Sequence, residues 1–134
     1  MKIGLVSDSK CYLKKESLKR HIETTNISFN ISDLGVYNEL AEIHYEQLAK
    51  TAVDFLYENK KAICILVDIT GSGISMFANK FEGIKAVTCF NVLSTKEALK
   101  EYDANMFAIS SLTSLEEAIQ IIDLILNYNN ELAE

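Results

Sequence analysis

The sequence contains no proline and no apolar stretch long enough to cross a membrane, and no signal peptide precedes its first apolar run. Without proline, no such residue marks a domain boundary or a linker, and neither an internal repeat nor a low-complexity tract is present. A chain of 134 residues is about the length of one domain and can bury its own core. We therefore expect a single domain over residues 1–134 and no membrane partner.

Cysteine and histidine are too few and too scattered for a structural metal site. Cys11, Cys64 and Cys89 lack the spacing of zinc ligands, and no cluster of cysteine and histidine exists. An odd number of cysteines without a disulfide framework fits a reducing compartment, so we expect a cytoplasmic protein that needs neither metal nor cofactor. His21 and His44 are both predicted to be exposed on helices, and neither completes a Ser-His-Asp or Cys-His arrangement.

Positive charge is also scarce, since 13 lysines and arginines face 19 aspartates and glutamates and leave a net charge of −6. This balance argues against nucleic acid as a partner and favours solubility. The hydrophobic share of 49% and the charged share of 24% are those of an ordinary globular protein.

Strand and helix patterns alternate five times along the chain. The predicted strands cover residues 2–7, 26–31, 62–67, 84–90 and 106–110. The predicted helices cover residues 10–24, 39–57, 74–81, 94–102 and 115 to about 127, with Ser94 and Ser114 as candidate N-caps. This alternation predicts an α/β fold, a Rossmann-like three-layer α/β/α sandwich around a five-stranded parallel sheet.

The chain is organised around residues 61–80, where a buried strand ends abruptly at Asp68 and a helix begins soon afterwards. Small and hydroxylated residues form the turn between them: Thr70, Gly71, Ser72 and Gly73. In an open α/β sheet, ligands bind beside such loops, because glycine lets backbone N–H groups approach an anion and a helix N-terminus favours negative charge. Turns of this kind also join strands to helices in proteins that bind nothing there, so the motif alone leaves both interpretations open.

Two carboxylates stand at the ends of adjacent predicted strands, Asp8 with Ser9 beside it, and Asp68. A carboxylate can act as a general base or bind sugar hydroxyls. Asp8 can equally be a helix N-cap, and Asp68 can equally accept backbone N–H bonds within its own loop. We expect a small-molecule pocket over residues 71–75, with Asp8 on one wall.

The segments VDITGSGISMFANKFEGIKAVTCF, at 67–90, and EYDANMF, at 101–107, resemble the type B ribose-5-phosphate isomerase family, which includes both subunits of galactose-6-phosphate isomerase. The opening KIGLVSD and the DLGVY segment at 33–37 are similar to the family as well. The most specific matches are Asn79-Lys80, Gly83 to Ala86, and Asp103 to Asn105. The resemblance implies aldose–ketose isomerisation of a pentose or hexose phosphate, with sites shared across a dimer.

Some family positions are changed in this chain. Asp68 stands where the isomerases carry a catalytic cysteine, as it does in the A subunit of galactose-6-phosphate isomerase, which this chain resembles there. The histidine that opens the sugar ring falls on Glu101, the histidine after the SD pair is Ser9, and the C-terminal arginines have no counterpart. Carried over residue by residue, the resemblance makes Asp68 and Thr70 catalytic. It gives the substrate Asp8, Ser9, Gly71, Ser72, Gly73 and Asn105.

These changes predict a partner-dependent or degenerate subunit, working as a homodimer or as a heterodimer with a cysteine-bearing homologue. Lys10 and Lys96 are the nearest candidates for the phosphate. One alternative is a catalytically inactive relative that still binds sugar phosphates. Another is a receiver-like phosphoacceptor domain, although Asp8 lacks the second acid beside it, and Ser110 and Ser111 stand where a receiver has a lysine.

Overall fold

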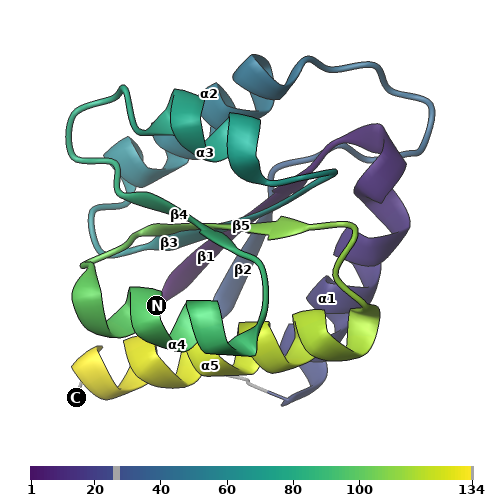
Figure 1. The fold of residues 1–134 in the computed structure, drawn as a ribbon. Helices are drawn as coiled ribbons and strands as arrows, with labels where there is room; N and C mark the ends of the chain where they lie inside the picture. Colours follow the sequence, from purple (N-terminus) through teal and green to yellow (C-terminus); the bar gives the residue numbers. More distant parts are fainter. Residues whose placement is uncertain (26–27, 134) are drawn as a thin grey trace.

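A computed structural model describes residues 1–25 and 28–133 of the protein, and Figure 1 shows the course of the chain. Five parallel strands form one sheet in the order β2-β1-β3-β5-β4. The strands are β1 (Lys2–Ser7), β2 (Asn30–Asp33), β3 (Ile63–Asp68), β4 (Ala86–Cys89) and β5 (Met106–Ser110). The helices are η1 (Ser9–Cys11), α1 (Tyr12–Thr25), α2 (Tyr45–Glu58), α3 (Ser72–Ala78), α4 (Val92–Glu101) and α5 (Leu115–Ala133).

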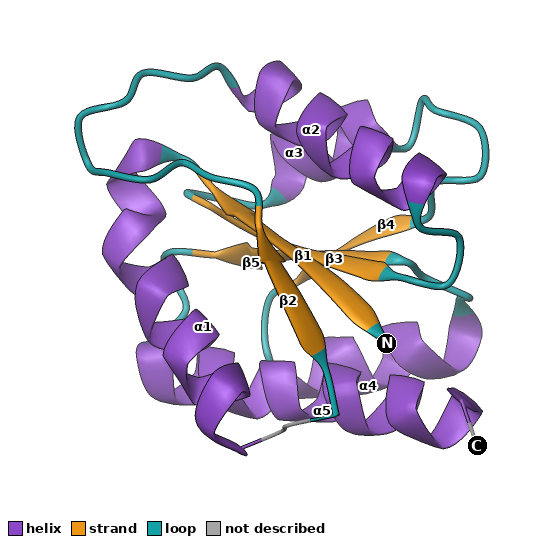
Figure 2. Cartoon of the chain, turned by 180° about the vertical axis from the view of Figure 1, so that it is seen from behind, coloured by secondary structure: helices purple, strands orange, loops and turns teal. Residues whose placement is uncertain are grey.

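Helices cover both faces of the sheet. Figures 1 and 2 show α2 and α3 on one face and α1, α4 and α5 on the other. Side chains alternate between the faces, so that Ile3 and Leu5 join the core beneath α1 and α5, whereas Val6 joins the core beneath α2. Burial on both faces requires the nearly continuous apolar runs of β1, β3 and β5. The predicted three-layer sandwich is confirmed. None of the helices within the described residues is both long and apolar enough to span a bilayer.

Four helices begin at residues other than predicted: α1 two residues late and α3 two residues early, whereas α2 and α4 differ because unexpected side chains cap them. α2 begins at Tyr45 instead of residue 39: His44 Nδ1 accepts the N–H of Glu46 at 3.4 Å, and the Gln47 side chain returns a bond to the His44 N–H at 3.3 Å. α4 begins two residues early because Asn91 is its N-cap and accepts the N–H of Ser94 at 2.8 Å. Residues 39–44 are therefore loop, and this loop borders the site described below.

The ends of β2 and α5 also differ from the predicted ones. β2 covers residues 30–33 instead of 26–31, and the predicted positions 26 and 27 lie outside the described residues. α5 begins as predicted, with Ser114 Oγ accepting the Glu117 N–H at 3.1 Å, but it continues past residue 127. The prediction of a solvated His21 is wrong, because its Nε2 lies 2.8 Å from the Asp123 carboxylate of α5.

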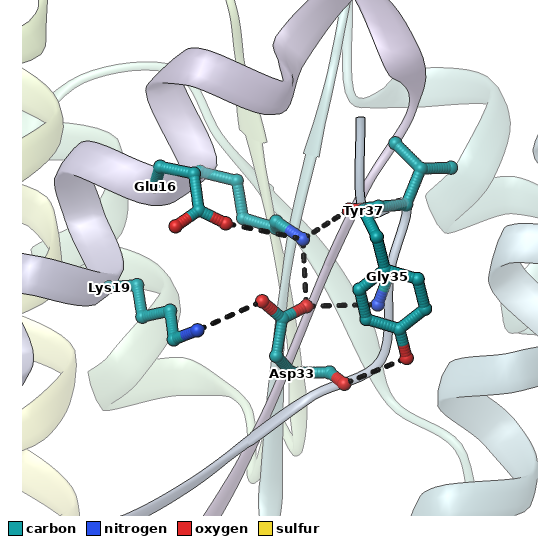
Figure 3. A network of polar contacts seen from close by, with 7 residues as sticks. Glu16, Lys19, Asp33, Gly35 and Tyr37 are labelled. Carbon is teal, nitrogen blue, oxygen red and sulfur yellow. Dashed lines mark hydrogen bonds and ion pairs between the residues drawn. The ribbon is translucent and has the colours of Figure 1, made fainter. Parts of the chain in front are cut away.

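A buried lysine attaches α1 to the loop that follows β2, as Figure 3 shows. The fully buried Lys15 side chain donates to Asp33 Oδ1 at 2.7 Å and to the Val36 carbonyl at 2.5 Å. Asp33 also accepts from Lys19 at 3.2 Å and from the Gly35 N–H at 3.0 Å. Burial by itself would raise the pKa of Asp33, but these donors outweigh it and lower the pKa. The network fixes the path of the loop from residue 34 onward.

Candidate functional site

The carboxyl ends of β1 and β3 bring Asp8 and Asp68 together. Ser7 pairs with Val67 in the sheet, and the Asp8 N–H donates to the Val67 carbonyl at 3.3 Å. Asp8, just after β1, and Asp68, the last residue of β3, therefore lie at the same level, and the Asp8 carboxyl is close enough to raise the pKa of Asp68. The structure thus forms the carboxyl pair that the sequence predicts at this edge.

Asp8 is a helix N-cap. Its Oδ1 accepts the Cys11 N–H at 2.9 Å and so caps η1, as one of its two predicted interpretations has it. Cys11 is buried against this carboxylate. Burial is the main cause that raises the pKa of the Cys11 thiol to about 12, and the hydrogen bond with Asp8 and the charge of Asp8 raise it further. Cys11 therefore stays a neutral thiol at neutral pH and does not replace the missing catalytic cysteine.

Asp68 accepts a backbone N–H bond within its own loop, as one of its two predicted interpretations has it, and its pKa is also raised. Its Oδ1 accepts the Ile69 N–H at 2.7 Å, and the Gly71 N–H is close enough to lower the pKa of the carboxyl. Burial raises the pKa of Asp68, the neighbouring Asp8 raises it further, and the two N–H donors offset only part of this rise. The Asp68 carboxyl therefore keeps its proton to a higher pH than an ordinary aspartate does, as is common for groups at functional sites.

The glycine-bearing loop is held by its own hydroxyls. Thr70 Oγ1 accepts the Ser72 N–H at 3.3 Å, and Ser75 Oγ donates to the Gly71 carbonyl at 2.8 Å. Gly71 adopts a φ of 80°, which lets the chain turn from β3 into α3. Ser75 is buried and bonded, whereas the Thr70 and Ser72 side chains keep contact with solvent.

An open cleft of about 440 Å³ adjoins Asp8, whereas Asp68 is not among the residues that line it. It is lined by Asp8, Ser9, Lys10, Glu42, Ile43, His44 and Ile69. Asp8 is on the wall as predicted, but the cleft lies beside residues 42–44 instead of over residues 71–75. The reason is the start of α2, which places the Tyr45 ring against Gly73, 3.8 Å from where a Cβ atom would stand.

Asn105, which the resemblance gives to the substrate, lies at the opposite edge of the sheet. Its Oδ1 accepts the Lys85 N–H and its Nδ2 donates to the Gly83 carbonyl, both at 2.9 Å, so it holds the turn before β4. It precedes β5 and lies far from Asp8 and Asp68 of the same chain, so its assignment to the substrate stays a prediction for a site that two chains share. Of the two lysines considered for phosphate, Lys10 lines the cleft, whereas Lys96 is exposed on α4.

No pattern in the sequence places Glu42 and His44 at the site, because both fall inside a predicted helix. The capping pair His44 and Gln47 was the available signal for a later helix start. Within the described part of the chain, no group of three or more potential ligand side chains could hold a metal ion. The site thus offers carboxylates, one lysine, one histidine and two isoleucines.

Replacing Gly71 by alanine should lower the free energy of unfolding by about 1–2 kcal/mol, because an L-residue is strained at positive φ. The added Cβ would also lie 3.1 Å from Thr88 Cγ2. Gly73→Ala is the matched control: its Cβ meets nothing closer than 3.8 Å, and alanine favours the helix, so stability should stay equal or rise. Urea unfolding followed by circular dichroism compares them, and equal midpoints would contradict the strain argument.

The family model described as Ribose/Galactose Isomerase matches residues 3–134. Ribose-5-P isomerase B of Listeria innocua is 30% identical over 112 residues, which are 84% of this chain and 74% of that protein. A ribose 5-phosphate isomerase structure from Thermotoga maritima has a TM-score of 0.84 at 29% identity, covering 93% of this chain and 85% of that one. Ribose-5-phosphate isomerase B from Mycoplasma genitalium, solved with bound ribulose-5-phosphate, has a TM-score of 0.86 at 26% identity, covering 98% and 91%.

Proposed function

Because the chain belongs to the Ribose/Galactose Isomerase family, we propose that it is a subunit of a sugar-phosphate isomerase in which Asp68 transfers the proton. The receiver-like alternative is overturned by this membership. Aldose–ketose isomerisation moves a proton between adjacent carbons through an enediol, and one residue can remove it from one carbon and return it to the next. The substrate we propose is a pentose or hexose phosphate.

The carboxyl pair is the observation that carries this proposal. Asp68 occupies the strand end at which the resemblance places the catalytic base, and the pKa of its carboxyl is raised by burial and by Asp8. A base whose pKa approaches the working pH is the more effective one, because it accepts a proton from carbon and releases it again readily. Thr70 stands beside it and can bind a sugar oxygen.

The chain is poor in cations for the phosphate, which supports dependence on a second chain. Arg20 is its only arginine and lies on α1, and Lys10 is the only lysine that lines the cleft. Large exposed apolar side chains stand just beyond the carboxyl ends of β3, β4 and β5: Ile69, Phe90 and Leu112. Exposed apolar surface beside a site is typical of an interface, so we propose a homodimer or a heterodimer with a cysteine-bearing homologue.

The location we propose is the cytoplasm. All three cysteines are free and buried, which suits a reducing compartment.

Turnover of ribose, allose and galactose phosphates tests this function, measured with the purified chain alone and mixed with a cysteine-bearing homologue. We expect slow turnover alone, because each missing donor at the transition state costs about 3 kcal/mol, and faster turnover in the mixture. Fast turnover by the chain alone would contradict partner dependence. Ligand binding without turnover in either sample would favour the inactive, sugar-phosphate-binding relative.

A further inference from the structure

We propose that His44 is the acid that opens the sugar ring in this chain, with Asp8 as the base for the anomeric hydroxyl. This inference rests on the proposed function, since it assigns a step that must come before isomerisation when the sugar phosphate arrives as a ring. A cyclic aldose has no free carbonyl, so the ring oxygen must gain a proton and the anomeric hydroxyl must lose one before the enediol can form.

No other histidine can serve the cleft from within the chain. The sequence has two histidines, and His21 is bonded to Asp123 between α1 and α5. Glu101, at the position of the ring-opening histidine in the resemblance, ends α4 and lines a different cavity together with Asn79 and Lys85. Since α4 begins at the carboxyl edge of the sheet and ends at the amino edge, Glu101 lies across the molecule from Asp8.

His44 lines the same cleft as Asp8, and its role as helix cap determines which nitrogen carries a proton. Nδ1 accepts the Glu46 N–H at 3.4 Å, so a neutral ring must carry its hydrogen on Nε2. Nδ1 also lies 3.4 Å from the Glu46 carboxylate, so in the imidazolium form, which can give a proton, Nδ1–H faces this carboxylate and no longer accepts the Glu46 N–H. Both forms carry a hydrogen on Nε2, and no hydrogen-bond partner for it exists among the described residues.

The ring is also held in one orientation. The Tyr45 ring lies with its centroid 4.6 Å from that of His44, and the side chain of His44 is 60% exposed, so its free edge can reach a ligand. The cleft offers Ile43 and Ile69 for the C–H face of a sugar, and Lys10 for an oxygen or phosphate. Such a mixture of carboxylates, donors and apolar contacts suits a polyol.

The step balances in protons. The imidazolium form of His44 gives its Nε2 proton to the ring oxygen and becomes neutral, with its remaining hydrogen on Nδ1 facing the Glu46 carboxylate. The bond between the ring oxygen and the anomeric carbon breaks, and the Asp8 carboxylate takes the proton of the anomeric hydroxyl as the carbonyl forms. Solvent returns the proton from Asp8 to His44 because the cleft is open. The two residues assigned to this step line the same cleft of one chain, so we expect the purified chain to open the ring by itself.

Exchange of ribose 5-phosphate between its two ring anomers measures ring opening directly, because the anomers interconvert only through the open chain. We would follow it by two-dimensional exchange NMR on the purified chain. Wild type should accelerate exchange above buffer, and His44→Asn should lose about 10²-fold or more of the protein-dependent rate. Asparagine is a strong N-cap, so α2 should remain intact, and His44→Ser, another good cap, serves if the first variant misfolds. His21→Asn, the histidine away from the cleft, should exchange as wild type does.

The same spectra separate this inference from the proposed function, since ketose signals report isomerisation. Anomer exchange that depends on His44 without ketose formation would leave the inference standing and would remove the proposed function. Equal exchange in wild type and His44→Asn, or no acceleration above buffer, would overturn the inference whether or not ketose appears.

Discussion

Asp68→Asn is expected to lower turnover of the active assembly by about 10²- to 10⁴-fold, the usual contribution of a general base. Asparagine keeps an oxygen for the Ile69 and Gly71 N–H groups, so the loop should not move, and only proton transfer is lost. If the partner is a homologue, its own catalytic cysteine is replaced by alanine so that turnover reports this chain. Unchanged turnover would show that Asp68 is not the base.

The same substitution should make the protein more stable at neutral pH. Because the pKa of Asp68 is raised above its unfolded value of 3.8, the folded state binds more protons, and stability is lost as pH rises through the folded pKa. Asparagine carries no charge and removes this loss, so the gain should be present at neutral pH and disappear below the unfolded pKa. Asp54→Asn, at an exposed carboxylate of α2, is the control. This variant should show no gain in stability at neutral pH and so no gain to lose in acid.

Turnover should also depend on the ionisation of Asp68, but it should rise with pH over the range in which stability falls. A base works only when deprotonated, so turnover should fall as pH decreases through the raised pKa of Asp68. The acidic limb of the rate profile should therefore lie at a higher pH than an ordinary aspartate would give. An acidic limb near the unperturbed value would contradict the raised pKa.

Lys15→Met is expected to lower the free energy of unfolding by about 3–5 kcal/mol, the cost of removing one partner from a buried charge pair. The side chain of Lys15 has no exposed surface, and its loss leaves Asp33 and the Val36 carbonyl without their closest donor. Lys19 remains 3.2 Å from Asp33, so the lower end of this range is the more realistic. Chemical unfolding measures the difference.

Lys19→Met is the matched control, because this lysine bonds the same carboxylate from a partly exposed position and should cost about 1 kcal/mol or less. The loss of stability at low pH gives a second test of the bond between Lys15 and Asp33. The pKa of Asp33 is lowered in the folded state, so it contributes stability above its unfolded pKa that is lost as pH falls through the folded pKa. Lys15→Met should reduce this loss, and equal acid sensitivity in wild type and variant would contradict the assignment.

Local patterns were sufficient to predict the layers of the fold and the meeting of Asp8 with Asp68. Strand and helix periodicities are properties of neighbouring residues, and a parallel sheet necessarily gathers its carboxyl ends at one edge. The predicted helix boundaries were wrong where a single side chain decides them. At His44 this happened because histidine is not among the preferred N-caps.

The cleft could not be predicted because its second wall depends on contacts far apart in the sequence. The loop that brings residues 42–44 opposite Asp8 leaves β2 along a path fixed by Lys15, a residue of α1 that reads as a surface lysine. The role of Asn105 in holding a turn depends in the same way on contacts far apart in the sequence, because its side chain bonds Lys85 and Gly83.

The strand order has a consequence for how the chain is made. β5 lies between β3 and β4 although it follows both in the sequence. On the ribosome, β4 therefore emerges before the strand with which it pairs, and until residues 106–110 arrive both β3 and β4 present unpaired edges. Such edges are where nascent chains aggregate or recruit chaperones. The interval in which this protein is vulnerable during synthesis is then set by how fast β5 and α5 are added.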